Sequence, residues 1–301
     1  MKRLKWALVV LTILLPIQNL DLFLALADEG YITTYDHHIM PGELELMIMN
    51  DFTAPSNIKR DKDGHGNYFS QMLELEYAPT SQLAFEFMAE GFEDVENGEG
   101  KFTGFRYEAR YKLFKDEVPL NPVAYVEYED LHLKTRYKME VSGWVDPPYD
   151  EEGDQPDRER ILESRLILSQ DIGAWNIAFN WINESDLNSG VTAFGYSLGL
   201  LCRVPQFLAQ MGYGHPGHVH KKDSNAHLHQ KFIEPTAFSF ELFGALGDTK
   251  SFGLQPSRQE HYFQPSIMFH VGKNTMVNIG IGIGLTKASD NMVRTSLGWM
   301  F

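Results

Sequence analysis

The sequence predicts an all-β fold, an antiparallel up-and-down transmembrane β-barrel of about twelve strands, with ten or fourteen strands left open. Three observations predict it. Apolar and polar residues alternate along most of the chain, the connections alternate between short and long, and the last strand ends on alternating aromatic residues. A strand protein can span lipid only as a closed barrel, because every backbone N–H and C=O group there needs an internal partner.

The clearest alternation lies in the last hairpin. From Val277 to Leu285 every second residue is aliphatic, and the residues between are glycine, except for one asparagine. The pattern resumes from Val293 to Phe301. In a barrel the apolar face meets lipid, and terminal aromatic residues lie at the membrane interface. The ending also resembles the C-terminal signal read by the outer-membrane barrel assembly machinery, with Arg294, Trp299 and Phe301 at the matching positions.

The remaining strands follow the same period of two. They are expected at residues 43–52, 67–77, 82–92 and 102–113 and, with weaker patterns, at 122–130, 160–170, 175–184, 191–201, 235–246 and 261–271. Short connections fall at 78–81, 171–174 and 272–274, and long ones at 53–66, 93–101, 131–159 and 247–260. This alternation is typical of barrels with short periplasmic turns and long external loops.

Two segments fit the pattern poorly. The connection 202–234 is long although it should lie on the periplasmic side, and Gln206 to Tyr213 within it has the pattern of a further strand. Leu131 to Val141 also alternates, which predicts either an extension of its neighbouring strand or an extra hairpin.

The N-terminus predicts a secretory signal. Basic residues precede an apolar run from Trp6 to Leu15, and Ala25 and Ala27 form the small-x-small pattern of a cleavage site. Residues 1–27 are therefore expected to be removed, leaving a barrel domain of 28–301 in the outer membrane of a Gram-negative-type bacterium. The alternative, an N-terminal anchor, is disfavoured because polar residues interrupt the apolar run before it reaches about 20 residues.

Composition narrows the function classes. The chain carries 26 basic and 41 acidic residues, a formal charge of −15, which disfavours binding to nucleic acids. The single Cys202 excludes an internal disulfide. The expected partners are outer-membrane lipid, the assembly machinery and a small-molecule solute.

The inward face of the predicted strands carries charges of both signs. These lumen residues are Glu45, Glu74, Glu76, Glu86, Glu90, Arg106, Arg110, Lys112, Arg165 and Arg294. One interpretation is a selective lumen in which the charges decide which solutes pass. The other is a structural one, in which acids and bases pair and close a narrow barrel.

A histidine cluster marks the 202–234 insertion. It consists of His215, His218, His220, His227 and His229, and it includes two His-x-His pairs that would share one face of an extended strand. Imidazole binds zinc, copper and nickel, so weak capture of a divalent metal (Zn, Cu or Ni) is one interpretation, although no cofactor is required. A solvated polar loop is the other.

Signals of catalysis are weak, and the sequence predicts no enzyme. Gln264, Ser266 and His270 merely share one strand face. Aromatic residues near predicted strand ends suit a membrane interface instead: Tyr77, Phe92, Trp175, Trp181, Trp299 and Phe301.

The segments Glu74 to Thr80 and Leu166 to Trp175 resemble strand-turn-strand segments of outer-membrane barrels of the phenol-degradation MetA-pathway type. The resemblance implies an outer-membrane location and passive solute transfer, and it assigns no functional residue. Three functions stay open: a passive channel, a metal-capturing barrel, and a structural barrel with a blocked lumen. A soluble periplasmic β-sandwich is the alternative fold, since it would show the same alternation with its apolar face turned inward.

Overall fold

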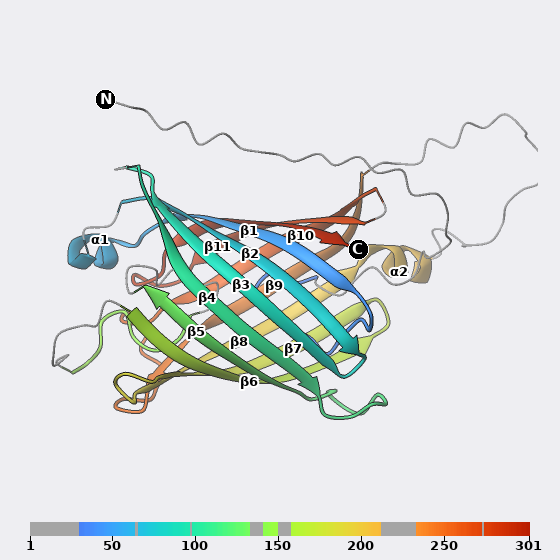
Figure 1. The fold of residues 1–301 in the computed structure, drawn as a ribbon, viewed down its shortest axis with the longest axis horizontal. Coiled ribbons are helices and arrows are strands. Elements are labelled where there is room, and N and C mark those ends of the chain that lie inside the picture. Colours follow the sequence, from blue (N-terminus) through green and yellow to red (C-terminus); the bar gives the residue numbers. More distant parts are fainter. Residues whose placement is uncertain are drawn as a thin grey trace, which may run out of the picture.

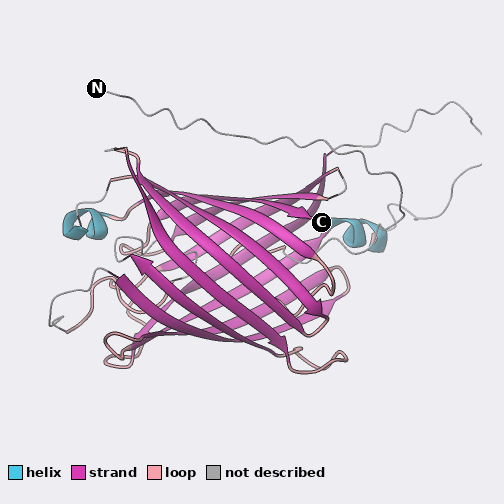
Figure 2. Ribbon diagram, viewed as in Figure 1, coloured by secondary structure: helices cyan, strands magenta, loops and turns pink. Residues whose placement is uncertain are grey.

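The computed structural model describes residues 30–63, 66–96, 98–132, 141–149, 158–211, 233–272 and 274–301. These residues form one closed barrel of twelve antiparallel strands (Figures 1 and 2). Its strands are β1 (Leu44–Ala54), β2 (Tyr68–Thr80), β3 (Leu83–Asp94), β4 (Glu99–Lys112), β5 (Val123–His132), β6 (Arg158–Ile172), β7 (Trp175–Asp186), β8 (Thr192–Arg203), β9 (Ile233–Asp248), β10 (His261–Val271), β11 (Thr275–Gly284) and β12 (Asn291–Met300). Each strand pairs with the next in sequence, and β12 pairs with β1 to close the barrel, so the predicted fold class is confirmed.

The two ends of the barrel differ in their connections. We call the end with the β2–β3, β6–β7 and β10–β11 turns the short-turn end and the opposite end the long-loop end. One predicted long loop, 93–101, is wrong. The β3–β4 ladder continues to the pair Asp94–Glu99, and Gly98, with φ of 67°, closes a tight turn there. This segment lies beyond the apolar part of the barrel, so its side chains are mostly polar. The apolar–polar alternation that predicts a strand is therefore absent from it.

Two short helices flank the barrel. Helix α1 (Asn57–Asp63) lies in the β1–β2 connection and α2 (Val204–Gln210) follows β8. The prediction of a further strand at Gln206 to Tyr213 is therefore wrong for residues 206–210, which are helical. Pro205, near the helix start, suits this position because proline fixes φ at a helical value. Residues 133–140 and 212–232 lie outside the described residues. Among those described, no helix is long and apolar enough to cross a membrane.

The apolar side of each strand faces outward. In the last hairpin Ile281 is 52% exposed and Trp299 is 45% exposed, whereas their inward neighbours Asn278 and Arg294 are buried. The same outward exposure recurs along the other strands, for example at Leu75. A surface of this kind is stable against hydrocarbon rather than water. The chain thus forms a transmembrane barrel and not the alternative sandwich, in which these residues would be internal.

Replacing Ile279 by arginine is expected to lower the free energy of unfolding by about 2–4 kcal/mol. Ile279 lies midway along β11 and faces outward, so the new charge would lie within hydrocarbon. Urea unfolding in lipid vesicles, followed by tryptophan fluorescence, measures the change. Leu285→Arg is the matched control, because this exposed residue follows the end of β11 and should lose only about 0–1 kcal/mol. Equal losses in the two variants would contradict a lipid-facing β11.

Candidate functional site: a polar lumen occupied by an N-terminal loop

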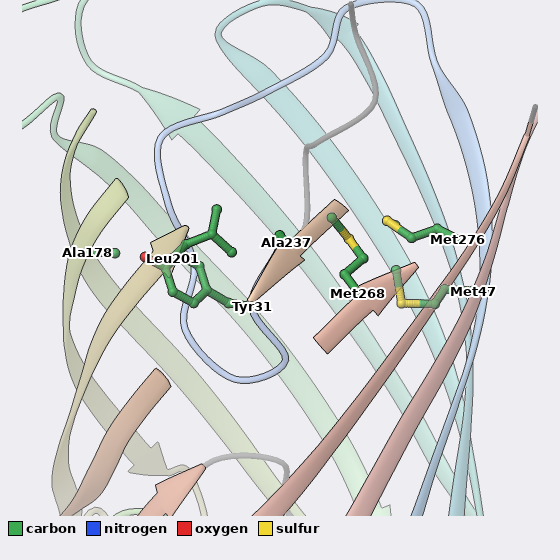
Figure 3. Packing of buried hydrophobic residues seen from close by; sticks show 7 residues of the cluster. All are labelled: Tyr31, Met47, Ala178, Leu201, Ala237, Met268 and Met276. Carbon is green, nitrogen blue, oxygen red and sulfur yellow. The ribbon is translucent and has the colours of Figure 1, made fainter. Parts of the chain in front are cut away.

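The lumen of the barrel is occupied by a loop from the N-terminal part of the chain. We call residues Gly30–Met40 the lumen loop. It starts near the short-turn end, where the Tyr31 hydroxyl donates to the Asn176 backbone oxygen at 3.0 Å. It turns back inside the barrel and returns to the same end, where His38 contacts Asp171. Figure 3 shows the loop bending within the barrel wall. The loop was not predicted, because these residues lack the alternation of a strand and the apolar run of a signal.

A buried carboxylate of β9 holds the bend of the loop. Glu241 accepts three successive backbone N–H groups, from Ile32 at 2.9 Å, Thr33 at 2.8 Å and Thr34 at 2.7 Å. Gln264 donates to the same carboxylate at 3.0 Å. Consecutive N–H groups that converge in this way form an anion-binding concavity. The loop and the wall therefore complete each other's hydrogen bonds, and among the described residues no backbone group of the loop bonds a backbone group of a strand.

Tyr35 of the lumen loop contacts charged side chains of the wall. Its backbone N–H and C=O both bond the side-chain amide of Asn180, each at 2.8 Å. Two guanidinium groups lie over its ring, with Cζ of Arg110 at 5.0 Å and Cζ of Arg165 at 4.9 Å from the ring centroid. Its hydroxyl donates to Glu108 at 3.0 Å. Cation–π contacts of this kind are strongest where water is excluded, so Tyr35 is a principal anchor of the loop.

Inward-facing glycines make room for the loop. A Cβ atom on Gly199 of β8 would lie 2.5 Å from Cε1 of Tyr31, and one on Gly280 of β11 would lie 2.6 Å from Cδ1 of Ile32. Both distances are shorter than atoms tolerate. The close approach of the loop is thus the tertiary reason for glycine at these two positions, whereas Gly282 of β11 faces Met292 instead.

An apolar cluster packs one side of the loop against the wall near the short-turn end (Figure 3). It consists of Tyr31, Met47, Ala178, Leu201, Ala237, Met268 and Met276, all buried. Six of these come from strands of the wall and one from the loop. Burial of these apolar side chains against one another favours the docked position of the loop.

The wall beside the loop carries a network of ion pairs. Arg110 contacts Glu76 at 2.7 Å and Glu108 at 3.1 Å, and it also pairs with Glu86. Arg106 pairs with Glu90 and bonds Glu127 at 3.0 Å. A small cavity remains between this network and the loop, lined on the wall side by Met49, Glu74 and Arg110. Acidic and basic side chains of the charged face thus form ion pairs between and along nearby strands.

The lumen is nevertheless strongly acidic. The buried carboxyl groups of the described strands belong to Glu45, Asp51, Glu74, Glu76, Glu86, Glu90, Glu108, Glu127, Glu129, Glu163, Glu184, Glu241 and Asp248. The buried guanidinium groups of the same strands belong to Arg106, Arg110, Arg165, Arg203 and Arg294. Carboxyl groups therefore exceed guanidinium groups by eight. Burying such an excess of negative charge is costly, so the lumen favours positive charge from bound protons or cations.

The structure places the predicted lumen residues on the inner face. Nine of them are buried and Lys112 is half-buried at the end of β4. Several inward acids were not predicted, among them Glu127, Glu129, Glu163 and Glu241. Their weaker strands were expected, and the same alternation could have identified them. Arg294, which was also expected to belong to an assembly signal, lies fully buried and contacts Asp51 at 2.9 Å.

Three further predictions concern the histidine cluster, the strand face shared by Ser266 and His270, and the interface aromatic residues. The histidines at 215–229 lie outside the described residues, so the metal expected there stays a prediction. Ser266 bonds Ser239 across the β9–β10 ladder, and Met268 separates it from His270 on the inner face. Among the expected interface aromatics, Trp181 lies in the middle of β7 rather than near its end.

Helix α1 and the neighbouring loops contact one another at the long-loop end. Lys59 of α1 bonds Asp290 at 2.8 Å and also pairs with Glu260. Burial lowers the pKa of Lys59, but these two carboxylates outweigh it and raise the pKa well above its usual value. The Trp144 indole N–H donates to the Ser251 carbonyl at 3.1 Å. These contacts thus join several connections of the long-loop end to one another.

Comparison with known proteins gives only a distant likeness. No protein-family model matches the chain, and no curated protein matches it. Solved structures that resemble it include LpxR from Salmonella typhimurium, with 8% identity, a TM-score of 0.41 and coverage of 85% of this chain and 100% of that one. A bacterial polysaccharide outer membrane secretin shares 9% identity at a TM-score of 0.38, covering 87% of this chain and 100% of that one. The Ralstonia pickettii toluene transporter TbuX shares 11% identity at a TM-score of 0.35, covering 87% and 90%. Likenesses at this level assign no function to the chain.

Proposed function

We propose that this protein is an outer-membrane barrel for the passage of small solutes, that it prefers cations, and that the lumen loop closes it. The observation that carries the proposal is the way the loop is held. Each of its described bonds to the wall involves at least one side chain, such as that of Glu241, Asn180 or Ser169, whereas the wall closes by its own backbone ladder. The loop can therefore leave the lumen without opening the barrel.

The chemistry of the lumen supports passage rather than a purely structural role. A barrel that only needed filling would be filled best by apolar side chains, since buried charges are costly. The wall around the loop instead carries carboxylates, amides and hydroxyls that water can solvate once the loop withdraws. Polar linings of this kind are typical of barrels with an aqueous channel.

The excess of carboxyl groups supports a preference for cations. Rings of acidic side chains select cations in pores, because they offset the loss of hydration of a positive ion. The same lining is a poor environment for apolar aromatic molecules, which a transporter of the phenol-degradation type would carry. Small cationic solutes are therefore the substrate class that we propose.

Planar-bilayer conductance tests the proposal. The parent chain is compared with a variant in which residues 30–40 are replaced by glycine and serine at the same length. We expect the parent to conduct rarely and the variant to conduct steadily, with a reversal potential in a KCl gradient that shows preference for K⁺ over Cl⁻.

The matched control replaces the exposed β7–β8 connection, residues 187–191, in the same way, and it should stay as closed as the parent. Heat-modifiable gel migration verifies that every barrel is folded. A folded variant without steady conductance would refute passage through the lumen. Steady conductance without a preference for K⁺ would refute the cation preference alone.

A further inference from the structure

Three adjacent residues of the lumen loop bring together side chains that bind metals. Asp36, His37 and His38 place a carboxylate oxygen and two ring nitrogens within 4.8 Å of one another. Asp36 and His37 are buried, and His38 is partly exposed near the short-turn end. This cluster lies far in sequence from the histidines of the 202–234 insertion.

His38 is oriented from both sides. Its Nε2 lies 3.1 Å from Asp171 Oδ2 of the wall, and its Nδ1 lies 2.9 Å from Asp36 Oδ1 of the loop. When Nε2–H donates to Asp171, the Nδ1 lone pair is directed at the Asp36 carboxylate. Two acceptors that face each other need a positive species between them. A proton or a metal ion can fill that position.

Asp171 has the position of an outer-shell partner. Histidines that bind metals usually donate their other ring N–H to a carboxylate, which fixes the ring and strengthens the ligand. The Asp171 carboxylate is itself held by Asn176 at 2.8 Å and by Arg203 at 3.0 Å. The wall therefore fixes the orientation of His38 before any metal binds.

His37 supplies the second ring. Its centroid lies 4.2 Å from that of His38, with the planes tilted by 32°. Ser169 of the wall holds His37 at two points, through the backbone N–H at 2.9 Å and through Nδ1 at 2.5 Å. The ring position is therefore set by the protein rather than by solvent.

We propose that Asp36, His37 and His38 bind one divalent transition metal, with Asp171 as the outer-shell partner of His38. Two imidazoles and one carboxylate suit zinc, cobalt or nickel. Two clusters of three glutamates among the described lumen residues, Glu74-Glu76-Glu86 and Glu127-Glu129-Glu163, contain no nitrogen ligand, and members of both contact arginines. The metal would stiffen the loop where it leaves the lumen. Metal binding itself does not depend on the proposed solute passage.

Titration with Co²⁺, followed by visible absorption, tests the site. The protein is the full folded barrel with the five histidines at 215–229 replaced by alanine, which removes a competing cluster. We expect one Co²⁺ per chain. His38→Ala should weaken binding at least about 100-fold, and Asp171→Asn should weaken it about 10–100-fold, the range typical of outer-shell partners.

His132→Ala is the matched control, because this residue lies at the end of β5 away from the loop, and it should leave the affinity unchanged. Asp36→Asn provides a second ligand variant if His38→Ala migrates as unfolded protein on heat-modifiable gels. A folded parent that binds no Co²⁺, or ligand variants that bind as tightly as the parent, would overturn the site. Either result leaves the conductance of the loop-replaced variant unaffected, so the two proposals fail separately.

Discussion

Replacing Glu241 by glutamine is expected to release the lumen loop while the barrel stays closed. In the native protein Oε2 accepts the N–H groups of Thr33 and Thr34, and Oε1 accepts those of Ile32 and Gln264. Glutamine has the same shape, but one of its two terminal atoms is an N–H donor. In either orientation this donor faces at least one backbone donor of the loop.

The expected loss is large, because hydrogen bonds to charged groups contribute about 1.5–3 kcal/mol each and unsatisfied buried donors are costly. We expect the docking of the loop to weaken by about 3–6 kcal/mol. Hydrogen exchange of the amides of residues 30–40, read by mass spectrometry, measures this directly. Exchange should accelerate at Ile32, Thr33 and Thr34, while the strand amides stay protected.

Glu90→Gln is the matched control, since it removes the same charge from a wall carboxylate that pairs with Arg106 of β4. Its loop amides should exchange as slowly as those of the parent. Unchanged exchange in Glu241→Gln would contradict the anchoring role of this residue. Faster exchange without higher conductance would show that another part of the protein closes the lumen, for example the connections at the long-loop end.

Replacing Arg294 by methionine is expected to destabilise the barrel itself. Arg294 and Asp51 lie opposite each other on β12 and β1, the two strands whose pairing closes the barrel. The guanidinium Nε contacts both carboxylate oxygens, at 3.1 and 3.0 Å, and Nη2 contacts Oδ2 at 2.9 Å. Removing one partner leaves the other charge buried, which typically costs about 3–5 kcal/mol.

Urea unfolding in lipid vesicles measures the loss of stability. The double variant Asp51→Leu with Arg294→Met should recover most of it, because the uncompensated carboxylate is gone. Arg158→Met is the matched control on the β5–β6 ladder, where Arg158 and Asp130 form an exposed pair at 2.6 Å. Such pairs contribute about 0–1 kcal/mol. A loss of that small size for Arg294→Met would show that the buried pair does not stabilise the closing ladder.

The barrel and its orientation were predictable because they follow from a local rule. In a strand, side chains alternate between two faces, so Ile279 and Ile281 had to share the face opposite Asn278 and Gly280. The same rule assigned Arg106 and Arg110 to the inner face from the sequence alone. The rule of alternation failed where polar residues continued a strand past the apolar part of the barrel, as at Asp94 and Glu99. It also failed where helix α2 formed in place of an expected strand.

The sequence by itself determined a closed barrel with an apolar exterior and a charged interior, since each of these properties depends on the period of two along a strand. Only the tertiary structure decided that a loop occupies the lumen, and which charges pair. The partners of the loop lie far away in sequence, as Thr33 and Glu241 or His37 and Ser169 do. No local pattern records such contacts, because they arise only when the closed wall brings distant strands around the same loop.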